Sequence, residues 1–165
     1  INSKYFRCYY TNDIIGVQFG GIIKNILAIA SGITESQNLG SSAKSALITR
    51  GLFEMKKIGL AYGAKENTFY GLSGLGDLIL TCNSNLSRNF VTGLLIGKGK
   101  KIKEITKIKK TISEGIINSK TIYKLSKKKR VEMPVCHSVY NILYKNYSVK
   151  KTIEKILSRD IKKEN

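Results

Sequence analysis

The sequence predicts an all-α domain, and three features of the chain point to that fold class. Apolar residues recur at steps of three or four along most of the chain, as they do on one face of an amphipathic helix. Serine and glycine residues that commonly begin or end helices separate these segments, and alternating, strand-like stretches are rare. A chain of 165 residues can bury one core without disulfide support, so a single helical domain is expected.

The first thirteen residues differ from this helical pattern. Residues 4–10 (KYFRCYY) are aromatic and partly alternating, which favours a short strand, and residues 11–13 offer a turn or a helix cap. We interpret residues 1–13 as the remnant of a preceding domain and residues 14–165 as the helical domain. The start shows no apolar run with a cleavage site and no initiator methionine, which indicates a fragment without a signal peptide.

Residues 14–33 are apolar almost all round and are interrupted by Gly16, Gly20 and Gly21, which predicts a helix buried on most of its faces. A transmembrane span is the alternative. Lys24 and the neighbouring Asn25 oppose it, because a lysine at the centre of a bilayer helix costs roughly 2.5 to 3.5 kcal/mol. We therefore expect no membrane span.

The later segments predict a series of shorter helices. Ser41 and Ser42 can cap a second helix that ends at Gly63, and a helical turn is expected over residues 66–70. Further helices are expected over residues 87–96, 101–110, 119–129, 135–145 and 148–158. Helix starts are indicated by Ser119 and Ser148, as caps, and by Pro134.

The chain is strongly basic, with a formal net charge of +18, and residues 98–165 carry 20 of its 29 lysine and arginine side chains. Clustered cations can bind nucleic acid or an anionic membrane surface, so a basic helical nucleic-acid-binding module is one hypothesis. The abundance of lysine, isoleucine and asparagine is also typical of A/T-rich codon usage. Codon bias is favoured, because the lysines form no ordered stripe interleaved with aromatic residues.

Cysteine usage argues against a disulfide framework and against a structural metal. Cys8, Cys82 and Cys136 are odd in number and far apart, and the sequence has no C-x-x-C pair or histidine cluster. We expect a reducing, cytoplasmic setting and no metal ligands.

The first candidate functional group is Lys24 with Asn25, in the middle of the most apolar segment. A lysine on a buried helix loses its water, which favours the neutral amine and suits a proton donor or acceptor. The structural alternative is a lysine that reaches solvent or forms an ion pair.

A second candidate is the glycine-rich segment that ends at Asp77, with Thr81 one helical turn further on. The glycines allow a close backbone approach, and a carboxylate is favoured at a helix start. An ordinary acidic N-cap is the alternative. The spacing does not match a dinucleotide-binding Rossmann signature.

The third candidate, Ser87-Arg88-Asn89, stands at a predicted helix start. Exposed amides, a guanidinium and two polar side chains there could bind a phosphate, and a capped surface helix is the alternative. Glu114 is a weaker candidate, as a lone acid in a loop. His137 has no nucleophile or metal partner in the sequence and is interpreted as structural.

Together these segments resemble the bacterial NAD(P)-dependent glycerol-3-phosphate dehydrogenases. The resemblance covers nearly the whole chain and rests on IGVQFGGIIKNILAIASGI, ALITRGLFEM, GLSGLGDLILTC, SRN, SEG and VEMPV, in the right order and separation. It implies a helical domain similar to the C-terminal domains of 6-phosphogluconate dehydrogenases. In the complete enzyme this domain would pack against an N-terminal Rossmann domain, of which residues 1–13 would be the remnant.

The resemblance also implies an activity: interconversion of dihydroxyacetone phosphate and sn-glycerol 3-phosphate with NAD or NADP, in a cytoplasmic homodimer that uses neither nucleic acid nor a membrane span. Lys24 and Asp77 would be catalytic, with Lys24 as the general acid or base. The implied substrate-binding residues are Lys24, Asn25, Asp77, Thr81, Ser87, Arg88 and Asn89. The implied cofactor-binding residues are Arg88, Ile112 and Glu114.

Two departures from the family pattern limit these implications. Ser113 stands where the family often has a hydrophobic residue, which puts the detail of the nucleotide contact in doubt. The chain also lacks the glycine-rich βαβ unit and a second lysine that the Rossmann domain contributes. This polypeptide alone is therefore expected to bind substrate weakly and to turn over nothing, and the choice between NAD and NADP stays open.

Overall fold

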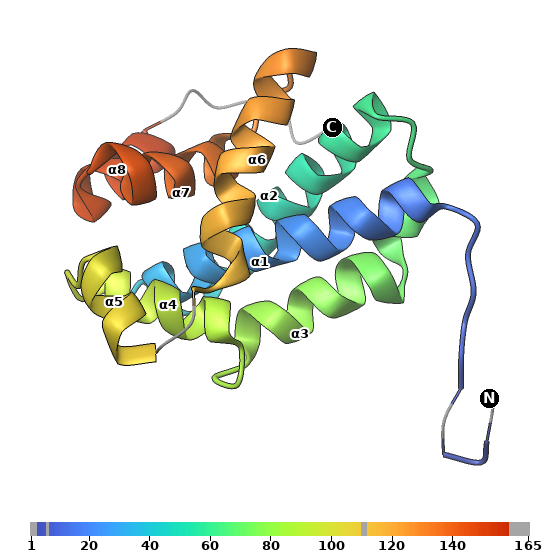
Figure 1. Ribbon diagram of the computed structural model, residues 1–165, viewed down its shortest axis with the longest axis horizontal. Coiled ribbons are helices and arrows are strands. Elements are labelled where there is room, and N and C mark those ends of the chain that lie inside the picture. The colour runs from blue at the N-terminus through green and yellow to red at the C-terminus, as the bar shows by residue number, and fades with distance from the viewer. Residues whose placement is uncertain (1–2, 6, 110–111, 159–165) are drawn as a thin grey trace.

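The computed structural model describes residues 3–5, 7–109 and 112–158, and this part of the chain folds into a helical bundle without strands (Figure 1). The fold class predicted from the sequence is therefore confirmed. In order, the elements are α1 (Ile14–Ser36), α2 (Gly40–Ala61), the 3-10 helix η1 (Glu66–Tyr70), the π-helical turn η2 (Leu72–Gly76), α3 (Asp77–Asn83), α4 (Arg88–Gly97), α5 (Ile102–Lys109), α6 (Glu114–Lys129), α7 (Pro134–Lys145) and α8 (Val149–Leu157).

Helix α1 is the centre of the bundle, because α2, α3, α4, α6 and α7 all pack against it. Figure 1 shows it crossing the middle of the molecule with the other helices around it. In the described part of the chain, α1 alone is long and apolar enough to cross a bilayer, yet 61% of its apolar window is buried by the fold. It is therefore the core helix that the sequence predicted, and its apolarity follows from contact with five other helices.

Two glycines allow α1 and α4 to touch backbone to backbone. A Cβ added at Gly32 would lie 2.1 Å from the carbonyl oxygen of Phe90, and one added at Gly93 would lie 2.1 Å from that of Ile29. No side chain fits at either position without moving a helix. The start of α4, which carries three of the candidate site residues, is thereby held against the centre of the molecule.

A buried glutamate attaches α7 to α2. Glu54 is 4% exposed, and its carboxylate accepts hydrogen bonds from the backbone N–H groups of Val135 (2.6 Å) and Cys136 (3.0 Å). These amides belong to the first turn of α7, where the helix dipole also favours an anion. Pro134 occupies the first turn as expected.

The strand predicted near the N-terminus is wrong for the residues that the structure describes. Residues 7–13 form no strand, and the side chains of Tyr5 and Tyr10 are 90% and 96% exposed. A strand needs a neighbour for its backbone hydrogen bonds, and no described segment supplies one. Asp13 instead caps α1, accepting a hydrogen bond from the N–H of Gly16 at 2.9 Å.

Most other helix boundaries agree with the sequence, and two do not. Helix α6 begins at Glu114 rather than near Ser119, whose side chain is buried within the helix. Helix α2 begins at Gly40, so Ser41 and Ser42 lie inside its first turn rather than at its cap. The expected caps of the remaining helices are confirmed by side-chain hydrogen bonds at Ser87 and Ser148 and by the positive φ of Gly63.

The α1–α4 contact predicts a large difference between two glycine substitutions on the same helix. Gly32→Ala should lower the free energy of unfolding by about 1–3 kcal/mol, because the new methyl overpacks the contact. Gly21→Ala should raise it by about 0.5–1 kcal/mol, because a Cβ there meets nothing within 4 Å and alanine is the better helix former. Chemical denaturation of the two variants measures both effects, and equal destabilisation would contradict the close-contact explanation.

Candidate functional site

Lys24 and Asp77 form an ion pair although 53 positions separate them in the chain: the Lys24 ammonium Nζ donates to the carboxylate oxygen Oδ2 of Asp77. Their side chains are 24% and 33% exposed, so Lys24 is only partly buried and is reached by solvent. The sequence left two alternatives for this lysine, a functional group in a sheltered site or an ion-paired structural one. The structure provides the ion pair, in a position open to a ligand.

The glycine-rich segment is what brings Asp77 to α1. A Cβ added at Gly20 would lie 2.5 Å from the carbonyl oxygen of Ser73, so the turn η2 rests directly on the backbone of α1. The chain then enters α3 with Asp77 in its first turn, one of the positions where a carboxylate is favoured by the helix dipole. Thr81 follows one turn later, and its hydroxyl lies 2.6 Å from the Asp77 carbonyl oxygen and 3.3 Å from the carboxylate oxygen Oδ1.

Two buried asparagines connect three helices next to this ion pair. Asn25 on α1 and Asn89 on α4 are 7% and 8% exposed, and the Asn89 amide Nδ2 donates to the Asn25 oxygen Oδ1 at 2.9 Å. The Asn89 oxygen accepts the backbone N–H of Gly115 at 2.9 Å, and the Asn25 amide donates to Glu114 on α6 at 3.1 Å. Both side chains are satisfied, and they fix the starts of α4 and α6 against α1.

Glu114 therefore belongs to the site, and not to an isolated loop as the sequence indicated. Its second carboxylate oxygen accepts a hydrogen bond from the Arg88 nitrogen Nη2 at 3.4 Å, with side chains that are 63% and 61% exposed. An ion pair this exposed contributes little stability. The Arg88 guanidinium can consequently exchange this partner for a ligand anion.

These residues surround an open cleft of about 260 Å³. Six predicted residues line it, together with two that the sequence analysis missed, Leu80 and Ser84; the six are Asn25, Thr81, Ser87, Arg88, Asn89 and Glu114. Leu80 follows Asp77 by three positions, and Ser84 follows Thr81 by three positions. Helical spacing from the two predicted residues could therefore have identified both. Lys24 and Asp77 do not line the cleft; Lys24 precedes the lining residue Asn25 in the chain, and the Asp77 carboxylate lies 3.3 Å from the hydroxyl of the lining residue Thr81. Ile112 is 50% exposed and does not line the cleft.

The chemistry available here is anion binding combined with proton exchange. Ser87 caps α4, and its oxygen accepts the N–H of Phe90 at 3.3 Å, so the helix start presents amides and the Arg88 side chain towards the cleft. Lys24 can donate a proton, and Asp77 balances its charge. Burial raises the pKa of the adjacent Cys82 thiol to about 12, so this cysteine stays protonated and does not act as a nucleophile. Within the described residues no histidine, cysteine and carboxylate groups cluster as a metal site would require.

Comparison with known proteins gives consistent matches over this part of the chain. Residues 13–154 match the family described as "NAD-dependent glycerol-3-phosphate dehydrogenase C-terminus". The chain is 46% identical over 164 residues to glycerol-3-phosphate dehydrogenase [NAD(P)+] of Francisella tularensis subsp. novicida, covering 99% of this chain and 49% of that protein. It is 44% identical over 162 residues to the protein of the same name from Citrifermentans bemidjiense, covering 98% and 48%.

Solved structures agree. The glycerol-3-phosphate dehydrogenase of Coxiella burnetii superimposes with a TM-score of 0.91 at 42% identity, covering 96% of this chain and 49% of that one. The enzyme from Saccharomyces cerevisiae has a TM-score of 0.83 at 28% identity, covering 94% of this chain and 46% of that one. The chain thus spans about half the length of the relatives that it matches. These matches do not support the nucleic-acid-binding alternative.

The asparagine connection predicts a stability effect at the site. Asn89→Ala should lower the free energy of unfolding by about 1–3 kcal/mol, because it leaves the Asn25 oxygen and the Gly115 N–H buried without partners. Asn83→Ala is the matched control, since this exposed amide makes its hydrogen bond to the carbonyl of Ile79 at the surface, and a change within about 0.5 kcal/mol is expected. Urea denaturation compares the two, and similar values would mean that the Asn89 bonds do not hold the helices together.

Proposed function

The chain belongs to the family of NAD-dependent glycerol-3-phosphate dehydrogenase C-termini, and on that premise we propose that it is the substrate-binding half of an NAD(P)-dependent glycerol-3-phosphate dehydrogenase. In this proposal the complete enzyme interconverts dihydroxyacetone phosphate and sn-glycerol 3-phosphate. The observation that carries the proposal is the ion pair of Lys24 with Asp77, formed across the bundle beside a cleft that also holds Arg88.

We place the substrate phosphate at the start of α4. Ser87, Arg88 and Asn89 lie there together, and a helix start with an adjacent guanidinium suits a dianionic phosphate. Asn25 and Thr81 extend the polar wall of the cleft from the phosphate end towards Lys24 and Asp77. A three-carbon phosphate bound in this direction has its carbonyl group near the lysine.

Lys24 acts as the general acid of the reduction and as the general base of the oxidation. Its ammonium gives a proton to the C2 oxygen of dihydroxyacetone phosphate and stabilises the negative charge that develops there. Asp77 holds the ammonium in position through the ion pair. The Thr81 hydroxyl donates to the Asp77 carbonyl oxygen at 2.6 Å and lies within 3.3 Å of the carboxylate. Because the Lys24 side chain is 24% exposed, water can return the proton after each turnover.

The nicotinamide cofactor, NAD or NADP, supplies the hydride that adds to C2 when it is bound. Arg88 and Glu114 have exposed side chains at the mouth of the cleft, and Ile112 is half exposed nearby in sequence, so these residues fit one edge of a dinucleotide. The 165 residues contain no glycine-rich strand-to-helix turn that would bind the pyrophosphate. We assign that role to an N-terminal Rossmann domain, with residues 1–13 as its end and the helical domain from residue 14 onwards.

The remaining proposals concern the complete protein. We place it in the cytoplasm, in keeping with the buried thiols of Cys82 and Cys136, which form no disulfide. By resemblance to the family we propose that it is a homodimer whose partners are its small-molecule substrate and its cofactor.

Substrate binding can be tested on the chain itself. Titration of ¹⁵N-labelled protein with sn-glycerol 3-phosphate should shift the side-chain amide signals of Asn25 and Asn89, whereas glycerol should leave them unchanged. Arg88→Met should weaken this binding about tenfold or more, since hydrogen bonds to charged groups contribute roughly 1.5–3 kcal/mol. Arg50→Met is the control, because Arg50 is exposed on α2 and does not line the cleft. Equal weakening by both variants would contradict the proposal that the substrate phosphate binds at the start of α4.

Proton exchange by Lys24 can be tested in the complete enzyme that contains this domain. Lys24→Met should lower kcat for dihydroxyacetone phosphate reduction by roughly 10²- to 10⁴-fold, the usual contribution of a general acid. Lys56→Met is a closely matched control, because the Lys56 side chain is 20% exposed and its ammonium pairs with the Glu66 carboxylate at 2.9 Å. Lys56 does not line the cleft, so this variant should retain turnover. Oxidation of the reduced cofactor, followed by absorbance, measures both, and near-normal turnover of Lys24→Met would exclude its role in proton transfer.

A further inference from the structure

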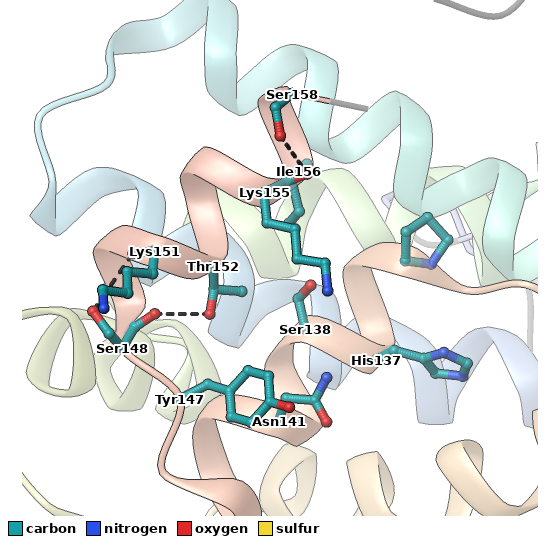
Figure 2. Close-up of a pocket in the computed structure, with 11 residues that line it drawn as sticks. His137, Ser138, Asn141, Tyr147, Ser148, Lys151, Thr152, Lys155, Ile156 and Ser158 are labelled. Carbon is teal, nitrogen blue, oxygen red and sulfur yellow. Dashed lines mark hydrogen bonds between the residues drawn. The ribbon is translucent and has the colours of Figure 1, made fainter. Parts of the chain in front are cut away.

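A second and larger cavity lies between α7 and α8 and shares no lining residue with the cleft beside Lys24. Its volume is about 890 Å³. Figure 2 shows side chains from both helices directed into the space between them. The catalytic proposal makes no use of this cavity.

Two helix faces form its walls. The α7 positions that line the cavity follow the spacing i, i+3, i+4 and i+7, and they are Pro134, His137, Ser138 and Asn141. The α8 positions follow the spacing i, i+1, i+4 and i+5, and they are Lys151, Thr152, Lys155 and Ile156. Each set lies on one side of its helix. The cavity is therefore bounded by two regular helices, joined by a short connection in which Tyr147 also lines it.

The electrostatic character of the cavity is cationic. Lys151 and Lys155 line it, and no aspartate or glutamate is among the lining residues. Neither ammonium lies within ion-pair distance of a carboxylate that the structure describes. In Figure 2 the Lys155 side chain extends from α8 towards the Ser138 hydroxyl on α7. Two cations in a recess without a carboxylate in its lining attract an anion.

One buried polar atom of this wall has no partner. The side-chain oxygen of Asn141 is inaccessible to solvent and accepts no hydrogen bond in the described structure. Because water does not reach this oxygen, a ligand in the cavity does not reach it either, so the atom is not part of the binding surface. Other lining groups are already used within the chain: the Thr152 hydroxyl, for example, donates to the Ser148 carbonyl at 2.7 Å.

The remaining lining is apolar. The Tyr147 ring, Ile156 and Pro134 contribute carbon surface around the polar groups. A recess with cations and apolar walls suits a molecule with an acidic group and a hydrophobic body. Inorganic phosphate would leave the apolar walls without a contact.

We propose that the α7–α8 cavity binds a small amphipathic organic anion. Its acidic group, a phosphate, sulfonate or carboxylate, lies between Lys151 and Lys155. Its apolar part packs on Tyr147 and Ile156. This site is separate from the substrate cleft, so it does not depend on the function proposed above.

Fluorescence titration of the chain with 8-anilinonaphthalene-1-sulfonate tests the proposal, because this probe carries a sulfonate and aromatic rings. Saturable binding of one molecule per chain is expected. Lys155→Glu should weaken it at least fivefold. Lys150→Glu makes the same charge change on the same helix, at an exposed position that does not line the cavity, and should leave binding within twofold of the parent.

Two further measurements keep the result interpretable. Backbone amide shifts in ¹⁵N-labelled chain should concentrate at Ser138, Asn141 and Thr152, and thermal unfolding should verify that each variant is folded. Shifts centred on Asn25 and Asn89, or equal weakening by Lys150→Glu and Lys155→Glu, would overturn the proposal. It would also be overturned if vesicles of phosphatidylglycerol bound the chain through Lys155 while the soluble probe did not, since the ligand would then be a membrane surface.

Discussion

The burial of α1 is the constraint on which the rest of the structure depends. This helix is covered by five others, so the polar side chains on its buried faces require hydrogen-bond partners within the protein. Lys24 receives a carboxylate from α3, and Asn25 receives partners from α4 and α6. The packing of an apolar helix and the assembly of the candidate site are consequently one event, because the same contacts accomplish both.

Glycine determines how closely this assembly can form. Gly20 allows the turn before α3 to rest on α1, and Gly32 with Gly93 allows α4 to do the same further along. The backbone contacts place the starts of α3 and α4 beside Lys24 and Asn25. Side chains near α1 are thereby held by buried bonds, whereas Arg88 and Glu114 at the mouth are exposed and can change partners. Buried side chains with fixed hydrogen bonds on one side of the cleft, and exposed charged side chains at its mouth, suit a cleft that must admit a small phosphate.

The excess of positive charge is easier to interpret in the structure than in the sequence. Several lysines of α6 and α7 extend over tyrosine rings: Lys127 and Lys145 lie 5.7 Å and 5.5 Å from the centre of the Tyr123 ring. The Tyr123 and Tyr140 rings stack on one another at 4.0 Å, so aromatic and basic residues are interleaved on this surface although they are not interleaved along the chain. In the described part of residues 98–165, Lys120, Lys127, Lys129 and Lys145 make such cation–π contacts, whereas Lys151 and Lys155 line a cavity.

The all-helical class, most helix boundaries and the candidate residues Lys24, Asp77 and Arg88 could be predicted from the amino-acid sequence, because apolar periodicity, caps and glycines act within one or two turns of the chain. The sequence did not determine what depends on a distant partner. Among the described residues, the strand expected over residues 4–10 finds no neighbour to pair with. Helix α6 starts early at Glu114, where the Ser113 hydroxyl bonds to Thr92 of α4 at 2.6 Å. The meeting of Lys24 with Asp77 and the α7–α8 cavity likewise exist only in the folded chain, since each requires two helices to be brought together by packing that no local pattern encodes.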